Sequence, residues 1–96
     1  MPLMVIGVGR ATLRIAGARS LKDKRRVLKS LLTRLHNRFN VAAAEVGLHD
    51  RHREAEIGIA CVSTAGSHAD SILAAILEFL QIQGDIELID YHTELF

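Results

Sequence analysis

The order of hydrophobic and polar positions along the chain predicts four β-strands. Residues 3–16, LMVIGVGRATLRIA, end in an alternation of polar and apolar positions, which is typical of a strand with one wetter face. Residues 41–48 and 54–63 are short segments rich in Ala, Val and Ile, and the polar HDRHR between them suits a hairpin. A last strand is predicted over residues 86–93, IELIDYHT.

The segment after the first strand has the spacing of an amphipathic helix. Apolar residues at positions 21, 28, 31, 32, 35 and 39 form one stripe. Ser20 precedes the stripe as an N-cap, and Asp23 completes a capping-box pattern in the place of the usual Glu or Gln. We expect this helix to end at Asn40.

A second helix is predicted over about residues 68–82, with Ser67 and Asp70 as its capping pattern and Gly84 at its C′ position. The element order is therefore β-α-β-β-α-β. Long right-handed crossovers then predict a four-stranded, mostly antiparallel sheet with both helices on one face. This is the ferredoxin-like plan of an α+β protein, and we expect residues 1–96 to form one domain.

Alternation along the strands assigns side chains to the two faces of this sheet. The positions predicted to face the helices are Val5, Leu13, Ala44, Val46, Ile57, Ile59, Ile86 and Leu88. Those predicted to face away are Ile6, Val8, Arg10, Ala43, Glu45, Ala60, Val62, Ile89 and Tyr91. With no third layer, the second set would expose an apolar patch, and contiguous patches usually mark interfaces. We therefore expect a homo-oligomer formed through the open sheet face, by way of Ile6, Val8, Val62, Ile89 and Tyr91. The alternative is that these side chains are scattered on an ordinary surface.

Composition places the chain among ordinary globular proteins, with 49% hydrophobic and 24% charged residues. A single cysteine excludes an intrachain disulfide framework and fits a reducing compartment. No basic region precedes the first apolar residues, and the longest apolar run, ILAAIL, is too short to span a bilayer. We expect a cytoplasmic protein without a membrane partner.

Charge is strongly segregated, although the formal net charge is only +1. Residues 19–38 contain eight Lys and Arg residues against one Asp, whereas the rest of the chain contains four basic and ten acidic residues. Such a distribution creates a local positive field that the total charge does not reveal.

The predicted first helix carries Lys22, Arg25, Arg26 and Lys29 on one side, clear of its apolar stripe. Lys24 falls near the buried side, and we expect its amine to reach out at the helix end. Like-charged neighbours four residues apart, and cations in the first turn, slightly destabilise a helix. An anionic partner explains the arrangement better, and RNA suits it best. The alternative is a solvated helix whose charges pair with Glu residues on adjoining elements.

A phosphate would also suit the start of this helix, where free N–H groups lie beside Ser20. The candidate nucleic-acid or anion-binding residues are Arg19, Ser20, Lys22, Lys24, Arg25, Arg26 and Lys29. The predicted central strands contain no aromatic residue, so base stacking on the sheet is not expected. RNA would be held by its backbone, with little sequence preference and a strong salt dependence.

The sequence gives little support for a metal site, a reactive cysteine or a nucleotide-binding loop. His49, Asp50 and His52 lie on a predicted turn without a cysteine, which is weak grounds for a metal site. Cys61 is in register with core isoleucines and is expected to be a buried small hydrophobe. The first glycines lie within a strand, which excludes a dinucleotide fingerprint. We expect no enzymatic activity, no cofactor and no metal.

The segments GARSLKDKRRVLKSLLTRLHNRFNVAAAEVG and REAEIGIACVS resemble a small bacterial family of uncharacterised proteins, the DUF503 or YlxP-like proteins. Its members share the motifs G-x-R-S-L-K-x-K-R and R-F-N-V-x-x-A-E-V and a strand that ends in V-S. In this chain the three correspond to Gly17–Arg25, Arg38–Val46 and Cys61–Ser63. The resemblance covers nearly the whole chain and implies a ferredoxin-like fold and a cytoplasmic protein. Members are often encoded beside translation and transcription factors, which implies a role with RNA or ribosomal particles. No enzymatic activity comes with the family.

Two hypotheses follow from these observations. In the first, the protein binds RNA or a ribosomal particle through phosphate contacts of its basic helix. In the second, it is an oligomeric regulatory or interaction module whose charged helix receives a small anion or the acidic surface of another protein.

Overall fold

The computed structural model describes residues 4–96, so Leu3, the first residue of the predicted first strand, lies outside the described residues. The elements are β1 (Val5–Arg14), α1 (Leu21–Arg38), β2 (Ala42–Gly47), β3 (Glu54–Ser63), α2 (Gly66–Gln81) and β4 (Glu87–Leu95). The four strands form one antiparallel sheet in the order β2-β3-β1-β4. The predicted ferredoxin-like α+β fold is confirmed.

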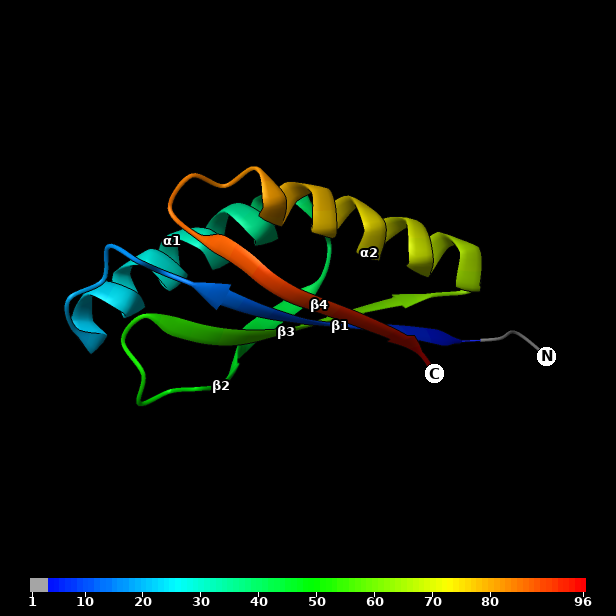
Figure 1. Cartoon of the computed structure of the whole chain (residues 1–96). Helices are drawn as coiled ribbons and strands as arrows, with labels where there is room; N and C mark the ends of the chain where they lie inside the picture. Colours follow the sequence, from blue (N-terminus) through cyan, green and yellow to red (C-terminus); the bar gives the residue numbers. More distant parts are fainter. Residues whose placement is uncertain (1–3) are drawn as a thin grey trace.

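Both helices lie on the same face of the sheet (Figure 1). α1 lies over β2, and α2 lies over β1, β3 and β4. The core lies between these layers, and Leu13, Ile57, Ile59 and Ile86 are buried there as predicted. The opposite face of the sheet has no covering layer among residues 4–96, so it is available to solvent or to a partner.

The start of α1 is capped as the sequence predicts. The Ser20 hydroxyl accepts the backbone N–H of Asp23 at 3.1 Å. The Asp23 carboxylate accepts the N–H of Arg19 at 2.9 Å, one residue earlier than in the usual capping box. The two residues together satisfy donors that the first turn would otherwise leave free.

The ends of α2 differ from the prediction. The helix begins at Gly66, two residues earlier, and its N-cap is Ala65, which makes no side-chain cap. Ser67 therefore lies inside the first turn and does not cap it. The C-cap is Ile82, so Gly84 lies one residue beyond the C′ position, and no glycine in the described part of the chain has a positive φ.

The predicted faces of β2 are wrong by one residue. Ala43 and Glu45 face the helices, because each lies opposite a buried isoleucine of β3. Ala44 and Val46 consequently face away, and Val46 is 49% exposed. Alanine on both faces of this strand left the apolar pattern ambiguous, and Val46 and Glu45 favoured the wrong choice.

The predicted position of Tyr91 is also wrong. A β-bulge in β4 opposite the Thr12–Leu13 step makes Ile89 an extra residue, which reverses the alternation beyond it. Tyr91 therefore faces the helices, and its hydroxyl donates to the carbonyl oxygen of Leu73 on α2 at 2.8 Å. It takes no part in the exposed face of the sheet.

Candidate functional site

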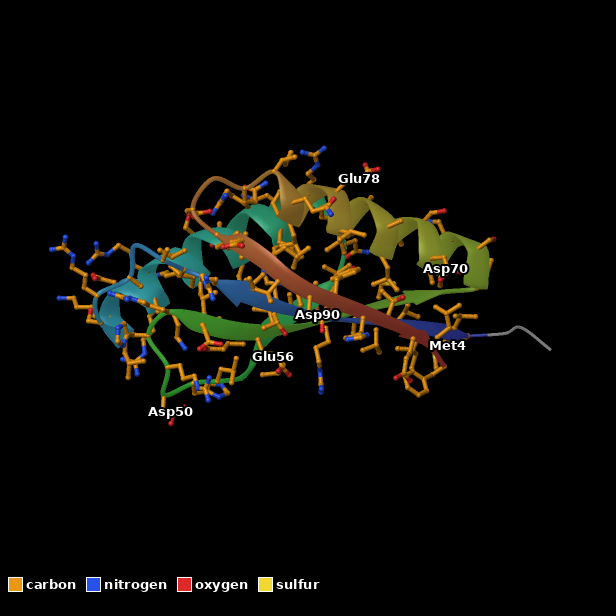
Figure 2. All side chains as sticks on the ribbon, in the orientation of Figure 1. Met4, Asp50, Glu56, Asp70, Glu78 and Asp90 are labelled. Atoms are coloured by element: carbon orange, nitrogen blue, oxygen red, sulfur yellow. The ribbon has the colours of Figure 1, made fainter. Side chains whose placement is uncertain are left out.

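Exposed cations at the start of α1 and just before it form the basic surface, which we define as Arg19, Lys22, Arg25, Arg26 and Lys29. α1 buries its leucine stripe against the sheet, and this orientation forces the side chains on its opposite side into solvent. Figure 2 shows blue nitrogen atoms gathered around the start of α1, whereas the labelled carboxylates of Asp70 and Glu78 lie along α2. The segregation of charge along the sequence is thus a segregation in space.

Most of the basic surface lacks an internal counter-ion. Only Arg26 has one, and its guanidinium is 3.7 Å from Asp23 with a side chain that is 73% exposed. Within residues 4–96, the other four members have no carboxylate within ion-pair distance. Exposed, loosely held ion pairs contribute little, so Arg26 also stays available to an external anion.

The prediction that Lys24 reaches out from the helix end is wrong, because its side chain is only 1% exposed. Its ammonium lies 2.9 Å from Glu45 Oε2. It also donates to the carbonyl oxygens of Leu48 at 2.9 Å, Glu54 at 3.1 Å and His49 at 3.4 Å. Lys24 therefore belongs to the interior, and it cannot contact a nucleic acid.

The buried Lys24 explains two features of its surroundings. Glu45 faces the helices because the ammonium neutralises its carboxylate there, although Oε2 accepts no well-aligned hydrogen bond from the described residues. The contact is therefore chiefly electrostatic. Leu48 adopts a left-handed conformation with φ of 59°, which is rare for this residue type, and the ammonium holds its carbonyl group. Through these contacts Lys24 connects α1 to β2 and to the turn before β3.

The start of α1 is less suited to a phosphate than the sequence suggests. The Ser20 hydroxyl is occupied as a cap, and the Asp23 carboxylate lies beside it. A phosphate at this helix terminus would face that negative charge. An open cleft of about 740 Å³ nearby has mixed charges for the same reason. Its ionisable lining residues are Arg14, Arg19, Arg26, Asp23, Asp85 and Glu87.

The structure adds two arginines that sequence reasoning missed. Arg14, at the end of β1, and Arg53, just before β3, are exposed and line a shared hollow of about 340 Å³. The Arg53 guanidinium donates to the carbonyl oxygen of Ala18, which places it beside the start of α1. The alternation of arginines in β1 was the available signal, but only the backbone hydrogen bond from Ile15 to Arg53 brings Arg53 close to Arg14.

The uncovered face of the sheet carries an apolar patch at one end. We define the far-face patch as Ile6, Val8, Ala60, Val62 and Phe96. Ile6 lies opposite Val62 and exchanges two backbone hydrogen bonds with Phe96, at 2.9 and 2.8 Å. Val62 is 67% exposed and Phe96 70% exposed. Phe96 is an addition to the predicted set.

Two residues of the predicted self-association set lie elsewhere. Tyr91 is on the helix face, and Ile89, although 51% exposed, lies at the bulge near the start of β4. The Arg10–Glu56 ion pair, at 3.1 Å, crosses the middle of the sheet between the far-face patch and this region. Of the predicted set, Ile6, Val8 and Val62 therefore lie together, at the end of the sheet where β4 finishes.

Candidates for catalysis are few. No group of three or more His, Cys, Asp or Glu residues in the described part of the chain could hold a metal ion. Cys61 is buried, as predicted. Burial, and secondarily the neighbouring Cys61, raises the pKa of Tyr91 to about 12, so its phenol stays protonated. Ser63 Oγ is 2.9 Å from His68 Nδ1, but it also accepts the N–H of Ala65 and serves the start of α2.

Comparison with known proteins assigns the chain to a family. No helix of residues 4–96 is long and apolar enough to cross a membrane. The family model described as "Protein of unknown function (DUF503)" matches residues 6–93. The protein described as "Uncharacterized protein YlxP" of Bacillus subtilis (strain 168) is 38% identical over 92 residues, which are 96% of this chain and all of that protein. The chain therefore belongs to the DUF503 family.

Proposed function

We propose that this protein is a non-enzymatic, cytoplasmic binding protein that associates with RNA or a ribosomal particle through its basic surface. The observation that carries the proposal is a set of exposed cations at and just before the start of α1 that have no carboxylate partner within residues 4–96, Arg19, Lys22, Arg25 and Lys29. Arg53, whose guanidinium donates to the carbonyl oxygen of Ala18, adds a cation beside the start of the helix. Phosphate groups along an RNA backbone are matched by such a row of cations.

The energetics favour an external partner over a purely structural role. Lys22 and Arg26, and likewise Arg25 and Lys29, are like-charged pairs four residues apart on α1, which destabilise a helix by a few tenths of a kcal/mol each. Of these four cations, only Arg26 has a carboxylate within ion-pair distance among residues 4–96. A surface that is mildly unfavourable to the free protein is accounted for by an anion that binds it.

Contacts with bases are not part of the proposal. Neither β1 nor β3 carries an aromatic residue, so the two central strands offer no surface on which bases could stack. Cations on a helix bind the phosphate backbone with little regard to sequence. We therefore expect affinity that depends strongly on salt and weakly on the RNA sequence.

The test is the salt dependence of binding to a fluorescein-labelled single-stranded RNA, followed by anisotropy. The triple variant Lys22→Ala/Arg25→Ala/Lys29→Ala should bind more weakly. The slope of log K against log salt should become shallower by about 2, which is three phosphate contacts on a single strand. An unchanged slope would remove α1 from the interaction and overturn the proposal.

The matched control removes three cations that already have carboxylate partners. The variant Arg10→Ala/Arg34→Ala/Arg51→Ala has the same change of net charge, and its residues pair with Glu56, Asp85 and Glu54 in the native protein. Its salt slope should stay close to that of the unaltered protein. An equal loss of slope in both variants would mean that net charge, not the basic surface, governs binding.

The second candidate is a regulatory or interaction module that binds a small anion or an acidic protein surface at the same cations. The two candidates differ in what accompanies the purified protein. RNA binding predicts a high ratio of absorbance at 260 and 280 nm that falls after a salt wash. The alternative predicts a low ratio and a melting temperature that rises with inorganic phosphate.

We also propose that two copies associate through the far-face patch. Exposed apolar side chains gathered on one face, such as Val62 and Phe96 on either side of Ile6, are typical of an interface. The variant Val62→Glu should shift the protein to a monomer in sedimentation velocity. Val46→Glu is the control, since Val46 is 49% exposed on the same face but outside the patch. A monomeric parent protein at high concentration would contradict this proposal.

A further inference from the structure

We propose that the groove between α1 and the open edge of β2 binds an extended, acidic segment of a partner protein, which adds a strand to the sheet. This interaction goes beyond the proposed RNA binding, because it uses the flank of α1 that faces β2 and the backbone of β2. The proposal rests on three properties of the groove: its lining, the state of the strand edge, and its charge.

The lining combines an apolar floor with a polar and cationic rim. The groove has a volume of about 330 Å³. Leu28 and Leu32 form its floor, and Arg25, Lys29, Thr33, His36 and Glu45 surround them. Leu32 remains partly exposed there, whereas the other leucines of α1 after the first turn are buried against the core. An apolar side chain inserted between the two elements would cover it.

The edge of β2 is free to accept a strand. β2 is the outermost strand on its side of the sheet, so within residues 4–96 its outward N–H and C=O groups have no strand to pair with. Native proteins usually protect such edges with Lys, Pro or inward-facing charges. β2 has the sequence AAAEVG, in which small side chains leave the backbone accessible. Its one inward charge, Glu45, is neutralised by the buried Lys24.

The charge of the rim indicates which kind of segment the groove would bind. Arg25 and Lys29 are exposed cations without a carboxylate partner in the described part of the chain, and His36 lies about two turns further along α1. A strand paired with β2 would present alternate side chains to this rim, so carboxylates flanking an apolar residue would match it. The segment therefore combines acidic residues with a central aliphatic one.

Other occupants fit less well. Two copies joined edge to edge through β2 would bring Arg25 and Lys29 of each copy together, and like charges across an interface are unfavourable. A head-to-tail arrangement with β4 of another copy would be open-ended and would produce filaments. RNA would place its phosphates against the leucine floor, where no aromatic side chain can stack on a base.

The experiment uses the blocked peptide acetyl-TETLTET-amide as the probe, and its charge-reversed counterpart acetyl-TKTLTKT-amide as the control. The readout is an NMR titration of backbone amides and leucine methyl groups. The acidic peptide should cause saturable shifts at residues 42–46 and in the methyl groups of Leu28 and Leu32. Added salt should weaken its binding, and the basic peptide should cause no saturable shift.

Two variants separate this site from the basic surface. Leu32→Gln should weaken binding of the acidic peptide about tenfold and leave the salt slope of RNA binding unchanged. Lys22→Ala should leave peptide binding unchanged, because Lys22 does not line the groove. The two proposals can therefore fail independently.

Several results would overturn the inference. Equal affinity for the two peptides would refute the charge argument, and the absence of saturable shifts at millimolar peptide would refute the docking site. Shifts of the groove signals on simple dilution would indicate a second copy of the chain. Stronger saturable shifts of the groove methyl groups with a single-stranded RNA would indicate that RNA is the occupant.

Discussion

Replacing Lys24 by methionine removes a buried charge while keeping an unbranched side chain of similar length. In the native protein the ammonium contacts the Glu45 carboxylate and donates to three backbone carbonyl groups. The variant Lys24→Met leaves all four oxygens without this partner. We expect a well-folded protein of much lower stability, because the leucine stripe of α1 is unchanged.

The expected loss of stability follows from the burial of the Lys24–Glu45 ion pair. Removing one partner of a buried ion pair costs about 3–5 kcal/mol, because the other charge is left without compensation. The Glu45 side chain is 20% exposed, so water can solvate part of its charge, and we expect the lower end, about 3 kcal/mol. A domain of this size has a free energy of unfolding of about 5–15 kcal/mol, so the loss is large but measurable.

The assay is equilibrium unfolding in urea, followed by circular dichroism, for a double-mutant cycle. The single variants are Lys24→Met and Glu45→Leu, and the double variant combines them. Replacing a buried pair by apolar residues is often nearly neutral, so the double variant should be more stable than Lys24→Met alone. We expect a coupling free energy of about 2 kcal/mol at an unchanged m-value.

Two outcomes would refute this reasoning. A loss below about 1 kcal/mol for Lys24→Met would mean that the ammonium is solvated and not buried. Additive single variants would mean that the two side chains do not interact. RNA binding provides an independent check. The salt slope of RNA binding by folded Lys24→Met should equal that of the parent protein. A shallower slope would mean that Lys24 contacts the RNA.

Three further predictions concern other parts of the fold. Burial raises the pKa of Tyr91, the single tyrosine, to about 12, so its phenolate absorbance should appear near that pH in the native protein and near 10 in urea. Stability should fall from about pH 10 to 12, because the unfolded chain loses this proton first; a native titration near 10 would contradict this. Gly7→Ala should cost about 1–3 kcal/mol in urea unfolding, because the added Cβ would lie 2.9 Å from Cys61 Sγ. Gly17→Ala, with nothing within 4 Å, is its control, and equal effects would disprove the packing argument. Ser20→Ala should cost about 1 kcal/mol through the lost cap and leave the RNA salt slope unaltered; a shallower slope would instead make the hydroxyl a phosphate contact.

The family motifs acquire a structural meaning from these contacts. Lys24 lies in the motif at the start of α1, and Glu45 lies in the stretch that ends β2. The two motifs are far apart in the sequence but meet in one buried ion pair. Part of what resembles a binding motif is therefore a folding contact, whereas Lys22 and Arg25 of the first motif are exposed.

The sequence by itself determined the element order, the fold class and the side of α1 that faces solvent. These features depend on local periodicity, because a stripe of leucines on one side of a helix determines which side packs against the sheet. The capping role of Ser20 was predictable, because a cap is a contact between near neighbours in the sequence. The burial of Cys61 was also predictable, because strand alternation is a short-range pattern. The exposure of the basic surface follows from the same periodicity.

Only the tertiary structure decided the positions that depend on partners distant in the sequence. A bulge in β4 changes its alternation, and pairing with β3 determines which face of β2 lies toward the helices. Lys24 is buried because Glu45 and the turn at Leu48 receive its charge, and helix spacing alone could not show this. The physical reason is that the cost of burying a charge depends on which groups meet it, and chain folding determines which groups those are.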